Sequence, residues 1–412
     1  MPLFTMPFRR RRARQPRIAL IWAQFSAYHG DRLEAVARRL AGRAEVLGIE
    51  VCARSHAYRW EPSGAVRGAR KHCLFPGQAF EDVPPLRRWW AQLRAVRGCD
   101  VVFVGLGYNE PDAVLLGWAL RLMGVRVVVM TASKWDDRPR RIGLELAKRF
   151  LLAPFVAAVV GGARQHDYVR FLGFRRRPVL CGYNTVGVRR IRVQAGDPVG
   201  MAQPEFAQRP FVFVGRFVPK KQLDLLLDAY ARYVARVGGQ AHRLVLIGAG
   251  EQEAELRQRC AALGLAGLVD WPGFLGATEV AEQLSRGLAL VLVSREEQWG
   301  LVVNEALAVG LPVIVSRQAG AADALVGNFE TGFVVSPGAV AEIAAAMTAM
   351  AADPQRWAAM SAKAARRSWL GDAGRFADAI EVLTFPEDRC SPAARRQARF
   401  TARLLAACGS AA

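Results

Sequence analysis

The chain has 412 residues, of which 52% are hydrophobic and 23% charged, enough for two domains with full hydrophobic cores. Its nearest approach to a membrane span, residues 150–163, is 14 residues long and contains Pro154. This is shorter than the ~18–20 apolar residues that cross a bilayer, which argues against a transmembrane protein. The seven cysteines form no CxxC pair and have no histidine at ligand spacing, which predicts free thiols in a cytoplasmic protein and no metal site.

The net charge of +21 is concentrated in one half of the chain. Residues 1–200 hold 35 Lys and Arg against 15 Asp and Glu, whereas residues 201–412 hold 22 against 21. A half this basic is expected to attract anionic partners, such as acidic lipid, phosphorylated lipid or nucleic acid. A basic surface without a partner is the alternative interpretation.

Residues 1–17 contain a run of four arginines and predict a disordered basic arm, with no apolar stretch that would make it a secretory signal. Strands and helices then alternate to about residue 193. Strands are expected at residues 18–22, 100–105 and 125–130, and helices at residues 31–47 and 111–123. Strands that are apolar throughout and separated by helices are typical of a parallel sheet covered on both faces.

Residues 194–208 are polar and contain Pro and Gly, which predicts a linker, after which the alternation restarts. Strands are expected at residues 211–214, 243–247, 268–271, 288–293 and 312–316. Helices are expected at residues 223–237, 251–263, 278–286, 301–309, 339–350, 354–367 and 374–383. We therefore predict two doubly wound, Rossmann-like α/β domains, at residues 18–193 and 209–385, that bind ligands beyond the carboxyl ends of their strands and in a cleft between them. Residues 386–412 are expected to form a tail or helix that returns to the first domain.

Three segments that follow strands of the second half carry candidate ligand groups. In the first, Gly215 permits a sharp turn, after which Arg216 and Lys221 can converge on one anion. In the second, Gly248 permits close approach of the backbone to a nucleotide, which is a weak signal by itself. In the third, Phe274 follows a Gly turn and can lie against a base. The alternatives are solvated charges for the cations and a place in the core for the phenylalanine.

The fourth segment leads into the helix expected from residue 301. The N-terminus of a helix presents free N–H groups and a partial positive charge, so a diphosphate is expected there, with Gly300 permitting close approach. Glu297 precedes this helix and Glu305 lies one turn into it, where they can hold hydroxyl groups at two ends of one ligand. A solvated helix face is the alternative for Glu305, but its neighbours are apolar, and a buried Glu requires a partner.

Together these residues resemble glycosyltransferase family four, the "group 1" transferases of the GT-B fold. The Glu-x7-Glu pattern of Glu297 and Glu305 is complete, as is the Gly-Arg-x4-Lys pattern of residues 215–221. The resemblance implies that Arg216 and Lys221 neutralise the donor diphosphate, Glu305 holds the ribose and Glu297 holds the transferred sugar, so that Arg216, Lys221 and Glu297 are the candidate catalytic residues. Further donor contacts are implied for Gly215, Gly248, Phe274, Gly300, Leu301 and Val302.

The first half resembles the family less closely. The candidate acceptor-side residues are Tyr28, His29, Arg32, Asp137 and Arg138. Many members place a histidine that faces the donor sugar in the loop that corresponds to residues 132–138, and this loop has none, so which residue replaces it stays open. Solvated loop charges, and a helix cap for His29, are the alternatives.

The resemblance implies a retaining, metal-independent transfer of a hexose-type sugar from a nucleoside diphosphate sugar to a hydroxyl acceptor, in bacterial polysaccharide or glycolipid synthesis. A UDP-sugar is favoured, a GDP-sugar is the other option, and no cofactor is expected. The basic half suggests a lipid-phosphate-linked acceptor or peripheral binding to the acidic inner face of the membrane, with residues 140–155 and 170–177 as contact segments, rather than nucleic acid. The alternatives are a glycoside hydrolase that uses the two glutamates, a nucleotide-sugar epimerase of the same architecture, and a non-catalytic basic adaptor.

Overall fold

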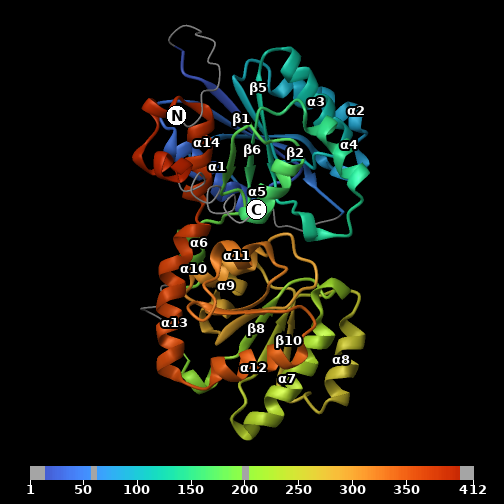
Figure 1. The fold of residues 1–412 in the computed structure, drawn as a ribbon, viewed down its shortest axis with the longest axis vertical. Coiled ribbons are helices and arrows are strands. Elements are labelled where there is room, and N and C mark those ends of the chain that lie inside the picture. Colours follow the sequence, from blue (N-terminus) through green and yellow to red (C-terminus); the bar gives the residue numbers. More distant parts are fainter. Residues whose placement is uncertain (1–13, 57–62, 197–203, 400–412) are drawn as a thin grey trace. The chain divides into compact units, whose positions relative to one another are not determined.

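The computed structural model describes residues 14–56, 63–196 and 204–399. Residues 1–13, 197–203 and 400–412 of the predicted arm, linker and tail lie outside this range. The described chain forms two compact α/β units, which confirms the predicted fold class (Figure 1). The second unit comprises Gly187–Asp372 together with Asp136–Arg138, and the rest belongs to the first unit.

The first unit is built on a seven-stranded parallel sheet with the order β3-β2-β1-β4-β5-β6-β7. Its strands are β1 (Arg17–Trp22), β2 (Glu45–Arg54), β3 (Arg70–Ala79), β4 (Val101–Val104), β5 (Arg126–Thr131), β6 (Ala157–Val160) and β7 (Val179–Cys181). Its helices are α1 (Ala27–Arg39), α2 (Pro85–Ala95), α3 (Pro111–Leu122), α4 (Ile142–Leu152), α5 (Ala163–Phe171) and α14 (Ala373–Thr384).

Both faces of this sheet are buried, which explains why its central strands are almost entirely apolar. Successive residues of a strand point to opposite faces. Accordingly, Ile18 and Leu20 belong to one core cluster, whereas Ala19 and Ile21 belong to another. The same alternation holds along β4, β5 and β6.

The second unit is built on a six-stranded parallel sheet with the order β10-β9-β8-β11-β12-β13. Its strands are β8 (Phe211–Val214), β9 (Leu244–Ile247), β10 (Val269–Gly273), β11 (Ala289–Leu292), β12 (Val313–Ser316) and β13 (Gly332–Val335). Its helices are α6 (Val188–Gln194), α7 (Leu223–Val237), α8 (Glu253–Ala262), α9 (Ala277–Arg286), α10 (Leu301–Ala308), α11 (Gly320–Leu325), α12 (Val340–Ala351) and α13 (Pro354–Arg367). The strand order reverses between β8 and β11, which is where ligands bind in sheets of this kind.

The helix predicted over residues 31–47 is wrong at both ends. Helix α1 begins at Ala27, because the backbone N–H of Ser26 donates to Nδ1 of His29 at 3.0 Å and so caps the first turn. It ends at Arg39, and the chain then turns through Gly42, whose φ is +71°, into β2. The apolar residues that looked like the last turn of a helix are therefore the start of a buried strand.

The predicted domain boundaries also differ from the structure. Helix α6 lies beyond the first unit, because Arg192 donates from Nε to the carbonyl of Ala308 at 2.8 Å within the second unit. The chain rejoins the first unit at Ala373 rather than at residue 386. Helix α14, predicted as part of the second domain, packs beside α1 through buried side chains such as Phe376 and Ile380 (Figure 1).

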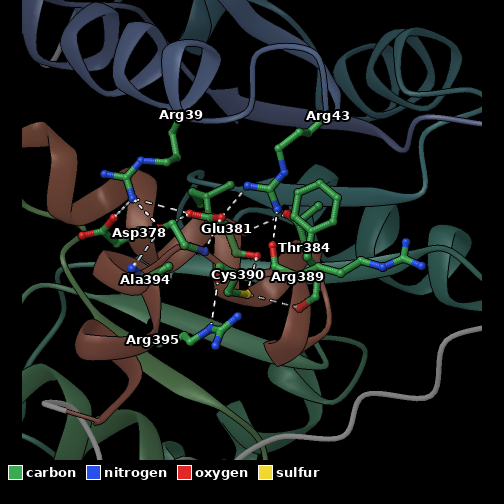
Figure 2. A network of polar contacts seen from close by, with 12 residues as sticks. Arg39, Arg43, Asp378, Glu381, Thr384, Arg389, Cys390, Ala394 and Arg395 are labelled. Atoms are coloured by element: carbon green, nitrogen blue, oxygen red, sulfur yellow. Dashed lines mark hydrogen bonds and ion pairs between the residues drawn. The ribbon is translucent and has the colours of Figure 1, made fainter.

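The buried carboxylate of Glu381 on α14 forms ion pairs with arginines at and just after the end of α1. The side chain of Glu381 has no exposed surface, and Arg43 Nη1 lies 2.6 Å from its Oε1 (Figure 2). Arg39 Nη1 lies 3.4 Å from its Oε2 and also pairs with Asp378, while Ser391 donates to both oxygens from its backbone N and its hydroxyl, at 2.8 and 2.7 Å. Burial by itself raises the pKa of Glu381, but the hydrogen bonds from Arg43 and Ser391 outweigh it, so that the pKa lies below the usual 4.5.

We expect Glu381→Gln to lower the free energy of unfolding of the first unit by about 2 kcal/mol, because two partly exposed guanidinium groups lose their shared anion. Urea denaturation at neutral pH would measure this change. The matched control is Glu387→Gln, a substitution of an exposed residue in the same C-terminal segment. Since the folded-state pKa is depressed, the contribution is fully present above pH 4.5 and is lost as the pH falls through the folded pKa. A loss that does not shrink at low pH would contradict this account.

Candidate functional site

The candidate site lies at the carboxyl ends of the central strands of the second unit, where three loops are joined by backbone hydrogen bonds. The N–H of Gly215 donates to the carbonyl of Ile247 at 3.0 Å, and that of Phe217 donates to Ala249 at 2.9 Å. The N–H of Gly248 donates to the carbonyl of Gly273 at 2.8 Å. The loops that follow β8, β9 and β10 therefore form one continuous edge.

This edge depends on glycines that have no room for a side chain. Gly248 has a φ of +137°, and a Cβ atom there would lie 1.9 Å from the carbonyl oxygen of Gly215. A Cβ atom on Gly250 would lie 2.3 Å from the carbonyl oxygen of Phe217. The glycine turn that was a weak signal in the sequence is thus a packing requirement between two loops.

Lys221 and Glu297 form an ion pair across this edge. Lys221 ends a short 3-10 helix after β8, and Glu297 lies in the loop between β11 and α10. The two loops are also joined by the backbone, because the N–H of Arg295 donates to the carbonyl of Lys220 at 2.8 Å. The sequence placed these side chains on different parts of one ligand, and the structure brings them together.

Arg216 differs from Lys221 in its surroundings. Its side chain is exposed, and this side chain makes no hydrogen bond or ion pair within the described part of the chain. It therefore remains a full positive charge beside a loop that already holds the Lys221–Glu297 pair.

The N-terminus of α10 adjoins the same loop. Gly300 precedes this helix with a φ of +93°, and a Cβ atom there would lie 2.8 Å from Leu292. Leu301 and Val302, in the first turn, are half-buried. The first turn thus presents backbone N–H groups, and the residue before it, Gly300, has no side chain to cover them. This arrangement favours the binding of an anion.

A buried tryptophan that the sequence analysis did not single out fixes this loop. Trp299 is 4% exposed, and its Nε1 donates to Oδ1 of Asn304 at 2.9 Å. Nδ2 of Asn304 in turn donates to the carbonyl of Gly371 at 3.2 Å. The signal in the sequence that could have identified this contact is the five-residue spacing between the aromatic Trp299 and the amide Asn304, which lie on either side of the helix start.

Two further predicted donor residues lie at this end of the unit. Phe274 is 68% exposed directly after β10, so the alternative that placed it in the core is wrong. Glu305 is half-buried on α10, less enclosed than its apolar neighbours suggested.

The candidate acceptor-side residues Tyr28, His29 and Arg32 lie on α1 at the carboxyl end of β1. Nδ1 of His29 accepts from the backbone N–H of Ser26, and burial together with the charge of Arg32 holds the pKa of His29 well below 6.5, so that its imidazole is neutral. Arg32 is 3% exposed, donates from Nε to the carbonyl of Thr185 at 3.0 Å and lies over the ring of Tyr183. The capping alternative for His29 is therefore realised, and burial lowers the pKa of Arg32.

The other two candidates, Asp137 and Arg138, lie at the end of a short 3-10 helix over Trp135–Asp137. Asp137 is half-buried and Arg138 is exposed. Their loop is held by Arg140, whose Nη2 donates to the carbonyl of Lys134 at 2.6 Å.

Solved structures share this architecture. Anabaena Alr3699/HepE in complex with UDP superposes with a TM-score of 0.64 at 17% identity, over 88% of this chain and 98% of that one. Sucrose-phosphate synthase from Thermosynechococcus elongatus superposes with a TM-score of 0.63 at 19% identity, over 89% and 98%. The fold is therefore the GT-B fold of glycosyltransferases, as predicted.

A family match covers most of the second unit. Residues 205–367 match the family described as glycosyl transferases group 1. Alpha-D-kanosaminyltransferase of Streptomyces kanamyceticus is 30% identical over 158 residues, and D-inositol 3-phosphate glycosyltransferase of Rhodococcus opacus is 30% identical over 181 residues. Each match covers 40% of the relative's length, and 38% and 42% of this chain. The second unit is therefore similar to the group 1 glycosyltransferases, which confirms the predicted resemblance.

We expect Gly248→Ala to destabilise the second unit by about 1–3 kcal/mol, because the added methyl group forces apart two hydrogen-bonded loops and occupies a strained backbone conformation. Thermal denaturation would measure the change. Gly267→Ala is the matched control, since a Cβ atom at Gly267 meets nothing within 4 Å. Equal melting temperatures for the two variants would show that the loops separate without cost.

Proposed function

We propose that the chain is a retaining, metal-independent glycosyltransferase that moves a hexose-type sugar from a nucleoside diphosphate sugar to a hydroxyl acceptor. The observation that carries the proposal is the convergence of Lys221, Glu297 and the N-terminus of α10 at one sheet edge, next to the exposed charge of Arg216. Hydrolysis by two carboxylates requires neither a cation pair nor a helix terminus, so these groups favour a transferase.

In this proposal the donor diphosphate binds between the helix terminus and the two cations. When the bond from the anomeric carbon to phosphate breaks, negative charge grows on the phosphate, and Arg216, Lys221 and the first N–H groups of α10 stabilise it. A single preorganised donor of this kind is typically worth ~3–4 kcal/mol. Glu297 would hold hydroxyl groups of the departing sugar, and Glu305 the hydroxyl groups of the ribose.

The Lys221–Glu297 ion pair gives this site a defined starting state. Each charge is neutralised by the other, and both side chains are largely enclosed, with 14% and 17% of their surface exposed. A donor would present phosphate to the ammonium group and hydroxyl groups to the carboxylate. It can therefore bind both groups without leaving either charge buried and unpaired.

UDP is the favoured nucleotide. Anabaena Alr3699/HepE has been solved with UDP and with UDP-glucose, which supports a UDP-sugar. A GDP-sugar is the second option, since a relative from Mycobacterium tuberculosis, 32% identical over 186 residues, is named a GDP-mannose-dependent mannosyltransferase. For the acceptor, we propose a bacterial polysaccharide or a lipid-phosphate-linked glycan.

Saturating UDP is expected to raise the melting temperature of the second unit by about 5 °C or more, because it binds only the folded state. Arg216→Ala should remove most of this shift, whereas Arg232→Ala, an equal loss of an exposed charge on α7, should leave it intact. A scan with UDP, GDP and uridine measures the shifts. No shift with either nucleoside diphosphate would reject the donor assignment.

Turnover is expected to depend on the leaving phosphate. With the nucleotide sugar that binds, Lys221→Met should lower kcat by about 10²–10³-fold, because it removes a charged donor that acts mainly as the bond breaks. Proton NMR of the product should show the anomeric configuration of the donor sugar, and EDTA should leave the rate unchanged. An inverted product or a rate abolished by EDTA would overturn the mechanism, and a product formed without acceptor would indicate an epimerase.

A further inference from the structure

Helix α4 of the first unit has its apolar side turned outward. The side chains that it buries include Glu145, whereas most of its large apolar side chains are exposed. The exposed fractions are 64% for Ile142, 62% for Leu144, 42% for Leu146 and 67% for Phe150. A helix on a soluble protein normally presents the opposite faces.

The inward side of α4 is held by a satisfied polar network. Glu145 accepts from Nζ of Lys148 at 2.6 Å and from the hydroxyl of Tyr168, and Arg140 lies 3.5 Å away with its side chain only 3% exposed. Burial by itself raises the pKa of Glu145, but the bonds from Lys148 and Tyr168 and the charge of Arg140 outweigh it and hold the pKa low. This network fixes the orientation of the helix, so the apolar side cannot turn inward.

Helix α3 extends the apolar surface. The rings of Trp118 and Phe150 lie 5.6 Å apart, which places α3 beside α4 (Figure 1). At the end of α3, Leu122 is 85% and Met123 59% exposed. Single exposed leucines are ordinary, but several large exposed apolar side chains on two neighbouring helices mark an interaction site. We call Leu122, Met123, Ile142, Leu144, Leu146 and Phe150 the α3–α4 face.

Cations border this face. Arg149 of α4 donates to the carbonyl of Phe171 at 2.9 Å, and Arg177 donates to the carbonyl of Leu152 at 3.0 Å, which ties the segment after α5 to α4. Arg175 and Arg176 in that segment are exposed. Residues 111–180 hold 13 Lys and Arg against 5 Asp and Glu, and the one acid of α4 is buried.

We propose that the α3–α4 face docks on an anionic lipid bilayer, which goes beyond the transfer reaction proposed above. An apolar surface with a cationic border is complementary to hydrocarbon beneath a layer of anionic headgroups. Among the described residues no helix is long and apolar enough to cross a membrane, so α4 would lie in the interface. Both contact segments expected from the sequence, residues 140–155 and 170–177, adjoin this face. Arg140, however, is enclosed within the protein, where it pairs with Glu145.

Co-sedimentation of the full chain with vesicles tests the proposal. Binding is expected to vesicles that contain phosphatidylglycerol and not to phosphatidylcholine alone, and to weaken with salt. Leu144→Gln with Phe150→Gln should weaken binding about tenfold or more. Arg175→Gln with Arg176→Gln should weaken it about fivefold for each charge.

Matched controls lie in the second unit. Leu263→Gln with Phe329→Asn removes two exposed apolar side chains, and Arg232→Gln with Arg236→Gln removes two exposed charges. These controls should bind like the parent chain, and every variant should keep the UDP-dependent melting shift, which separates loss of docking from loss of the donor site. Binding without preference for anionic lipid, or equal losses in the controls, would overturn the proposal. The proposal would also be overturned if the chain failed to bind vesicles and instead formed a dimer that Leu144→Gln with Phe150→Gln dissociates.

Discussion

Direct contact between the backbones of the loops that follow β8 and β9 is the constraint on which the second unit's site depends. The contact requires a residue without Cβ at Gly248 and Gly250, since the carbonyl oxygens of Gly215 and Phe217 occupy that space. Because the loops touch, the chain after β8 is directed across the sheet edge, where Lys221 meets Glu297. The charged residues thus derive their positions from a contact made by the main chain.

The sequence predicted the second unit well, because most of its strands are short and buried. Each predicted strand there corresponds to an observed one, and β13 is the observed strand that was not predicted. The first unit was predicted less completely. In residues 31–47 the apolar spacing fitted one helix. In the structure, the cap at His29 sets the start of α1, and the turn at Gly42 separates α1 from the start of β2. Neither signal is visible in apolar periodicity alone.

Long-range partners explain the remaining differences. Nothing local in residues 373–384 distinguishes a helix of the second unit from one that returns to the first, because the choice depends on Arg39 and Arg43, more than 300 residues away. Similarly, the Glu-x7-Glu pattern predicted two ligand-binding carboxylates, but the partner that Glu297 has in this structure, Lys221, lies 76 residues earlier. Spacing locates such residues along the chain, and only the fold determines which of them meet.

The charge of the first half has to be reinterpreted in the same way. Part of the basic charge that suggested an anionic partner lies inside the protein, where Arg32, Arg88 and Arg140 are enclosed and bonded to carbonyls, carboxylates or rings. An enclosed cation with a local partner contributes little to the field outside. What distinguishes the α3–α4 face is therefore the apolar surface that its arginines border. Charge alone would attract any polyanion, whereas apolar side chains forced outward by the Glu145 network favour a ligand that offers hydrocarbon as well.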